Sequence, residues 1–456
     1  MNQSGSTTIA SAKQEDIKKD SKSLVRVEVG QKVRFRVLLT YAVLLIVFGV
    51  AVDGFWNSVM GLKEIIKSPG ILISDYVAIA GIGAAFVNAG LVALFALIII
   101  KLAKAKISGL NVAAFFTIAG FALFGKNILN IWPIILGVWL HAKVLKRNFA
   151  DLIPPALFGT ALGPLVSKVA LDFGFNLSLG IVLGSICGII IGFIIPSLAS
   201  HLAVIHQGYN LYNIGFTAGI IGTAFMALFR GFGMNCESVL FWAESFNHIF
   251  VPALLIYFGS MILGGVILGK VGRKKDVATL KSIMNYSKGL ATDFIELAGF
   301  GPVLMNMGIM GILGMLYVIM VGGALNGPTI GGLFTIVGFS AFGKHPRNVI
   351  PIFIGVYLGT LTKIWSANAP GALLAALFGT TLAPIAGGFG PLAGIVAGFL
   401  HLSVVMNIGF LHGGTNLYNN GFAGGIVAGI LVPLIRTLGV MKPRTKKEQE
   451  VIDEQR

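Results

Sequence analysis

The chain has 456 residues, of which 55% are hydrophobic and only 11% are charged, with a formal net charge of +16. Many of its apolar stretches reach the roughly 20 residues that a helix needs to cross a bilayer, so the composition excludes a soluble globular protein. The basic residues gather at the chain ends and in short loops, as the positive-inside rule describes, which argues against nucleic acid as a partner. We therefore predict an all-α polytopic membrane protein with the lipid bilayer as its surroundings.

The predicted elements form six parts in chain order, and two of them are large apolar repeats. We expect the basic parts, and hence both termini, on the cytoplasmic side of the plasma (inner) membrane. The parts are a polar, lysine-rich segment (1–36), a first span with an amphipathic connector (37–75), repeat A (76–233), a linking span with a basic loop (234–301), repeat B (302–439) and a charged tail (440–456).

The two repeats are recognised by matching segments. Residues 206–222 read HQGYNLYNIGFTAGIIG and residues 412–428 read HGGTNLYNNGFAGGIVA, with ten of seventeen positions identical. Residues 117–140 match residues 335–358 at thirteen of 24 positions, and ALFGTALGP upstream of the first NLYN segment matches ALFGTTLAP upstream of the second. A duplicated apolar domain is typical of transporters and channels, whose substrate site lies between the copies.

The distribution of positive charge indicates that the repeats have opposite topology. After its third helix, repeat A has Lys143, Lys146 and Arg147, whereas repeat B has only Lys363 at the matching place. After the second helix the order reverses, and repeat B has the greater charge. Positive charge that alternates out of phase between two copies is expected when they cross the membrane in opposite directions.

The number of crossings depends on which segments are re-entrant. The candidates are the Pro- and Gly-bounded stretches 154–168 and 370–387, together with the start of each NLYN segment. Counting all of them as spans gives 14 crossings, and treating them as re-entrant gives ten. We therefore predict two inverted-topology repeats with about 10–14 membrane helices and possible re-entrant segments. Re-entrant backbone at membrane depth would line an aqueous path or be buried in protein.

The most specific motif is H-x-G-x-N-L-Y-N-x-G-F, which occurs once in each repeat. Its asparagines supply amide donors and acceptors that can replace the hydration shell of a small polar solute, and its tyrosines supply an aromatic wall. We predict that these residues line the substrate path, and the alternative is that they make interhelical hydrogen bonds. The predicted path residues are His206, Asn210, Tyr212, Asn213, His412, Asn416, Tyr418 and Asn419.

A second motif, F-G-K-x-x-x-N, contains Lys126 in repeat A and Lys344 in repeat B. The favoured interpretation is an interfacial lysine that snorkels to the lipid headgroups. The alternative is an entrance charge that attracts anionic or strongly polar solutes.

The acidic residues are scarce inside the repeats. Residues 302–441 contain no Asp or Glu, and repeat A contains only Asp151 and Asp172. A symmetric pair of membrane-depth carboxylates, the usual equipment of proton- and sodium-coupled carriers, is therefore not expected. This favours a neutral polar solute or an anion over a metal cation. Cysteine and histidine spacings give no metal site, and no HExxH or GxSxG motif indicates an enzyme, so we expect no cofactor and no catalytic residue.

The paired HxGxNLYNxGF and FGK motifs resemble an uncharacterised prokaryotic family of multi-pass membrane proteins with a duplicated domain of unknown function. The architecture is also similar to that of urea-channel-like inverted-repeat proteins, as an analogy of fold. We expect a membrane transport protein, most simply a channel or facilitator for a small neutral polar solute between the repeats. The alternatives are a secondary active transporter for a small anion or polar metabolite and, third, a membrane-embedded enzyme. A homo-oligomer is compatible with each.

Overall fold

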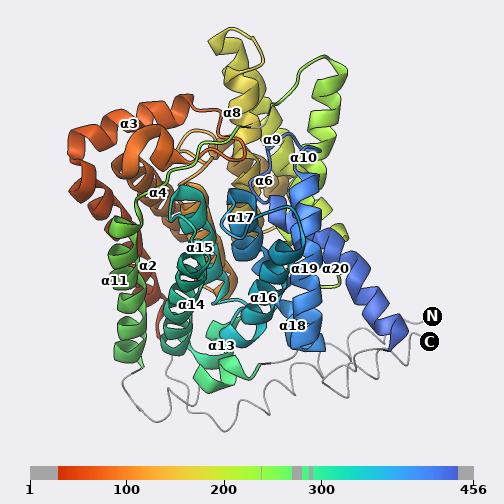
Figure 1. Cartoon of the computed structure of the whole chain (residues 1–456). Helices are drawn as coiled ribbons and strands as arrows, with labels where there is room; N and C mark the ends of the chain where they lie inside the picture. Colours follow the sequence, from red (N-terminus) through yellow and green to blue (C-terminus); the bar gives the residue numbers. More distant parts are fainter. Residues whose placement is uncertain (1–28, 238, 270–279, 287–290, 440–456) are drawn as a thin grey trace.

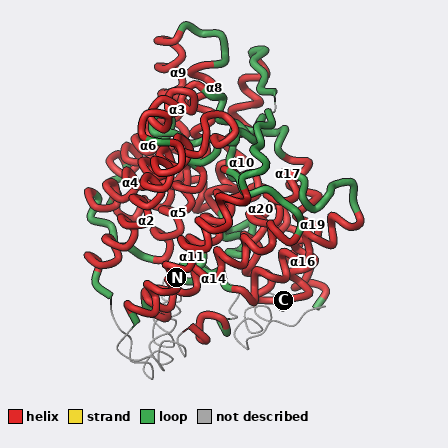
Figure 2. The backbone as a smooth tube through the Cα atoms, turned by 60° about the vertical axis from the view of Figure 1, so that its left-hand side comes forward, coloured by secondary structure: helices red, strands yellow, loops and turns green. Residues whose placement is uncertain are grey.

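The computed structural model describes residues 29–237, 239–269, 280–286 and 291–439. Across these residues the chain is helical, with two isolated β-bridges and no strand (Figure 1; Figure 2). Ten helical segments of this part are long and apolar enough to cross a membrane. The chain is therefore an all-α polytopic membrane protein, as predicted.

The helices of the first half begin with a leading helix, α2, that packs along α4. They are α2 (Gln31–Asp53), α3 (Phe55–Lys67), α4 (Tyr76–Leu102), α5 (Gly109–Phe121), α6 (Trp132–Val144), α7 (Ile153–Gly159), α8 (Gly163–Leu171), α9 (Leu177–Leu202) and α10 (Asn213–Gly231), with the 3-10 turns η1 (Phe149–Leu152) and η2 (Thr160–Leu162).

The second half repeats this order, and its leading helix α11 packs along α14 as α2 packs along α4. The structural equivalence thus extends upstream of the apolar repeats themselves. The helices are α11 (Asn247–Leu268), α13 (Phe294–Ala298), α14 (Phe300–Met320), α15 (Gly327–Phe339), α16 (Pro346–Thr362), α17 (Pro370–Gly379), α18 (Ala383–Phe389), α19 (Pro391–Ile408) and α20 (Asn419–Leu438), with the 3-10 turn η3 (Thr380–Leu382).

A glycine kink shows how closely the copies correspond. Gly81 interrupts α4 with φ +85° and ψ 167°, and Gly299 separates α13 from α14 with φ +91° and ψ 167°. Only glycine adopts such positive φ values without steric strain, so the same residue makes the same break in both copies. A side-chain cap precedes each kink, because Asp75 accepts from Val77 N and Asp293 accepts from Ile295 N.

The two copies are inverted with respect to each other. The central helices α5 and α15 cross antiparallel, because Gly120 packs on Gly331 near one end and Gly338 packs on Ala113 near the other. The leading helices α2 and α11 are also antiparallel, with Tyr41 against Tyr257 and Phe48 against Phe250. In Figure 1, α8 and α10 extend to the upper end of the bundle, whereas α18 and α20 extend to the lower end. The prediction of inverted-topology repeats is therefore confirmed.

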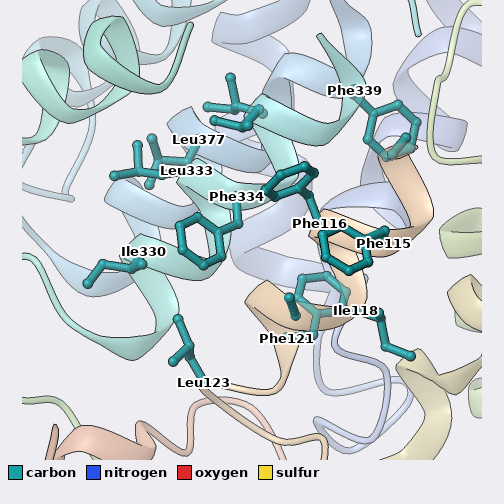
Figure 3. Packing of buried hydrophobic residues seen from close by; sticks show 14 of the residues in the cluster. Phe115, Phe116, Ile118, Phe121, Leu123, Ile330, Leu333, Phe334, Phe339 and Leu377 are labelled. Atoms are coloured by element: carbon teal, nitrogen blue, oxygen red, sulfur yellow. The ribbon is translucent and has the colours of Figure 1, made fainter. Parts of the chain in front are cut away.

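The interior of the bundle is formed by the short helices. Twelve residues of α5 and all thirteen of α15 are buried, and Figure 3 shows the rings of Phe116 and Phe334 between them. The longer helices α9 and α11 are peripheral and expose large apolar side chains such as Ile181 and Ile256. Exposed Leu, Ile and Val on the outer helices fit contact with lipid rather than water.

Helix breaks fall inside the two stretches predicted to be re-entrant, although Phe149–Leu171 and Pro370–Phe389 are each long and apolar enough to cross a membrane. A 3-10 turn separates α7 from α8 at Thr160, and its counterpart separates α17 from α18 at Thr380. Each threonine hydroxyl donates to the carbonyl three residues earlier, which satisfies one acceptor freed by the break. The residues before α10 and α20 also form turns rather than helix. Irregular backbone is thus concentrated inside the bundle, where protein groups satisfy it.

Candidate functional site

The candidate site lies at the interface between the repeats, where α10 and α20 begin. The two helices diverge from this place toward opposite ends of the bundle (Figure 1). Gly215 of α10 and Gly421 of α20 pack against each other, and a Cβ added to either would lie within 3.1 Å of the other's Cα. Tyr212 and Tyr418, the residues before each helix, bring their rings to 5.2 Å between centroids.

Within each repeat, the histidine and the second asparagine of the motif fix the NLYN turn to the preceding helix. The amide oxygen of Asn213 lies 2.9 Å from His206 Nε2, and its amide nitrogen donates to a carbonyl of α9. Asn419 makes the same pair of contacts, 2.9 Å to His412 Nε2 and a donation to a carbonyl of α19. These four side chains therefore form equivalent local clamps.

The first asparagine of each motif joins the two repeats. The amide of Asn210 donates to Gly421 O at 3.0 Å, and the amide of Asn416 donates to Gly215 O at 3.4 Å. Asn210 also accepts from Thr381 Oγ1. These contacts are the interhelical hydrogen bonds that the alternative interpretation of the motif predicts. Their contact with a solute stays a prediction.

The expectation of snorkelling lysines is wrong. Lys126 and Lys344 have no exposed surface. The cause is an asparagine in the preceding long helix of each copy, whose amide donates to two carbonyls of the lysine turn. Asn88 binds the carbonyls of Ala122 and Lys126, and Asn306 binds those of the equivalent turn around Lys344. This holds both turns inside the protein, so neither ammonium group stands at an entrance in this conformation.

The two lysines differ in their partners. Lys344 Nζ donates to the Tyr212 hydroxyl at 2.5 Å and to Thr380 Oγ1 at 2.7 Å. Lys126 Nζ has no hydrogen-bond partner and lies 4.9 Å from the centroid of the Phe121 ring. The ammonium group therefore makes hydrogen bonds in one half of the protein and none in the other.

An aromatic cluster fills the space between the lysines. The Tyr418 ring lies 4.5 Å from Phe121 and the Tyr212 ring 4.7 Å from Phe339, between ring centroids. Phe378 tilts against Phe121, and Phe158 stacks on Phe339. The sequence already carried this signal in the matching TIxGF and ALFGT segments, which we did not connect with the lysines. The cluster consists of Phe121, Phe158, Tyr212, Phe339, Phe378 and Tyr418.

The chain has a symmetric pair of aspartates, Asp75 and Asp293, whose carboxylates bind backbone groups of the opposite repeat. Asp75 accepts from the backbone N–H of Gly327 at 3.0 Å, and Asp293 accepts from that of Gly109 at 2.7 Å, so each aspartate binds the start of a central helix of the other repeat. Both lie just outside the predicted repeat bounds, 76–233 and 302–439. Their oxygens bind backbone N–H groups, and they do not pair with the buried lysines.

Positive charge at the interface therefore has no acidic counterpart in the described part of the chain. The ion pairs found there are Lys67 with Glu64 and Lys168 with Asp172, both within single helical turns. The same residues contain no group of three or more His, Cys, Asp or Glu side chains arranged for a metal ion.

Comparison with known proteins identifies the family but no function. The chain belongs to a family described as "Protein of unknown function (DUF1576)", which matches residues 56–231 and 273–437. The two matched regions contain the paired lysine and NLYN motifs, in agreement with the resemblance seen in the sequence. No curated protein and no solved structure matches the chain.

Proposed function

We propose that this protein is a secondary transporter that moves a small polar solute along the interface between its two repeats by alternating access. The observation that carries the proposal is the unequal state of two equivalent sites. Lys344 is bonded to Tyr212 and Thr380, whereas Lys126 has no partner although Tyr418 and Thr160 are its counterpart residues.

Two inverted repeats can exchange their conformations, and this gives two states of the protein that are related by the symmetry of the repeats. If the contacts exchanged, Lys126 would bind Tyr418 and Thr160, and Lys344 would be released. The interface would then open toward the opposite face, because the repeats run in opposite directions. A polar cavity of about 60 Å³, lined by His345, Asn348 and residues of the segment before α13, adjoins the Lys344 turn.

A channel for a neutral solute is the second candidate, and the NLYN motif favours it. It requires a continuous polar path between the repeats. The aromatic cluster instead closes the centre, and the amides of Asn210 and Asn416 bind protein carbonyls. These contacts support a carrier that must rearrange to pass its solute.

The test is transport by purified protein in proteoliposomes, with protein-free liposomes as the control. A carrier is expected to show saturable uptake of a labelled solute that is accelerated by the unlabelled solute on the other side. A channel would give rapid, non-saturating entry without that acceleration, seen for neutral solutes such as urea by stopped-flow swelling. Absence of flux for every neutral and anionic solute would reject both forms of transport.

A further inference from the structure

Three buried polar groups lie near the Phe121 ring at the central interface, and they are not bound by the rest of the protein. Lys126 Nζ is buried without a hydrogen-bond partner, and the buried hydroxyls of Tyr418 and Thr117 lie beside each other with no further partner. Lys126 lies over the Phe121 ring, the Tyr418 ring packs edge-on against that ring, and Thr117 lies one helical turn earlier beside the Tyr418 hydroxyl. Buried donors without acceptors are rare and cost free energy, and a bound ligand that accepts hydrogen bonds from these side chains would remove that cost.

The equivalent groups in the other half are satisfied. Lys344 donates to Tyr212, and the Thr335 hydroxyl donates to Gly331 O of its own helix. The difference is therefore not a general property of this fold. It belongs to the half of the interface that contains Lys126.

We propose that Lys126, Tyr418 and Thr117 form a binding site for a small monovalent anion. This inference rests on the proposed transport function and names the class of its solute. An ammonium group and two hydroxyls can all donate to an anion, and a halide or a compact oxyanion accepts from several donors at once. Lys126 brings one positive charge to this site, which one negative charge balances, whereas the Lys344 ammonium group lies at the other lysine turn and binds two neutral hydroxyls there.

The helix that follows Tyr418 adds to the positive field. Tyr418 is the N-cap residue of α20, a helix of twenty residues, and its side chain does not cap the helix. The first N–H groups of a helix and its dipole both favour an anion at this end. Cations are disfavoured by the buried ammonium group, and the carboxylates of Asp75 and Asp293 are occupied elsewhere.

The test is the thermal stability of the full-length protein in detergent with added anions at constant ionic strength, in a buffer whose own anion is a bulky sulfonate. Chloride, nitrate and formate are compared with sulfate and with urea. At saturation, at least one monovalent anion should raise the Tm of the wild type by about 2–4 °C. A response to chloride alone would identify a halide site, and a response to nitrate or formate an oxyanion site.

The variant Lys126→Met should lose this response, while it should fold at least as well because it removes an enclosed charge. Lys101→Met is the matched control, since it removes an exposed lysine that also lies over a phenylalanine ring. Tyr418→Phe removes one hydroxyl donor and should weaken the apparent anion affinity about tenfold.

An anion response of K126M equal to that of the wild type would overturn the site. So would the absence of any response of the wild type, or a larger response to sulfate or urea. Anion binding without transport would keep this site and reject the transporter. Saturable transport of neutral solutes without an anion response would keep the transporter and reject the anion site.

Discussion

Tyr212 and Tyr418 occupy equivalent positions and touch each other, yet their hydroxyl groups differ. The Tyr212 hydroxyl accepts a hydrogen bond from Lys344, whereas the Tyr418 hydroxyl has no charged partner and lies beside Thr117. A bond from a buried charged donor contributes more to stability than a neutral one, and removing an unsatisfied buried hydroxyl costs little. The loss of stability on replacing each tyrosine by phenylalanine should therefore differ between the two positions.

We expect Tyr212→Phe to lower the free energy of unfolding by about 1–3 kcal/mol, because it removes one of two acceptors of an enclosed ammonium group. Tyr418→Phe is the matched control and should change stability by less than about 0.5 kcal/mol in the absence of small anions. Thermal unfolding of both variants in one detergent measures this difference. Equal losses in the two variants would mean that the asymmetry of the lysine sites is not a property of the protein in solution.

The helices of the two repeats meet through small residues. Where α5 crosses α15, a Cβ added to Gly120 would lie 2.7 Å from the carbonyl oxygen of Gly331, which is closer than real Cβ atoms approach. Close backbone approach of this kind is typical of helix pairs in membranes. The contact joins the two repeats next to Phe121 of the aromatic cluster.

We expect Gly120→Ala to destabilise the protein by about 1–3 kcal/mol, because the added methyl group forces the central helices apart. Gly259→Ala in α11 is the control, since an added Cβ there meets no atom within 4 Å, and alanine is the better helix former by up to about 1 kcal/mol. Thermal unfolding measures the stability of both variants, and size-exclusion chromatography shows whether each elutes as a single monodisperse peak. A Gly120→Ala protein as stable as Gly259→Ala would show that the interface tolerates separation.

The sequence was sufficient to predict the inverted helical repeats, but not whether the two lysines are buried or exposed. The matching segments and the out-of-phase charges predicted inverted copies, because periodic identity and loop charge are local properties. Whether a lysine in an apolar stretch snorkels or is enclosed depends on a distant residue. Here Asn88 and Asn306, each 38 residues before its lysine, bind the lysine turns and hold them inside. The aspartates that cap the opposite repeat escaped notice for the same reason, since their partners are distant in sequence.

At the scale of the whole molecule, the inverted arrangement makes a direct prediction about sidedness. Lys126 and Lys344 are enclosed and cannot report it. The turns that follow α6 and α16 are equivalent in the two copies and expose Lys146 and Ser366. Because the copies run in opposite directions, these turns belong on opposite faces of the membrane.

We expect single cysteines at Lys146 and Ser366 to react with a membrane-impermeant maleimide from opposite sides. The background needs Cys187 and Cys236 replaced by alanine, which breaks no disulfide since both are free. In intact, right-side-out cells only one variant should be labelled, and in inside-out vesicles only the other. Labelling of both after permeabilisation controls for reactivity. The greater positive charge beside Lys146 predicts that this turn is the cytoplasmic one. Labelling of both variants from one side in sealed membranes would contradict the inverted insertion, and with it the exchange of equivalent lysine contacts on which alternating access depends.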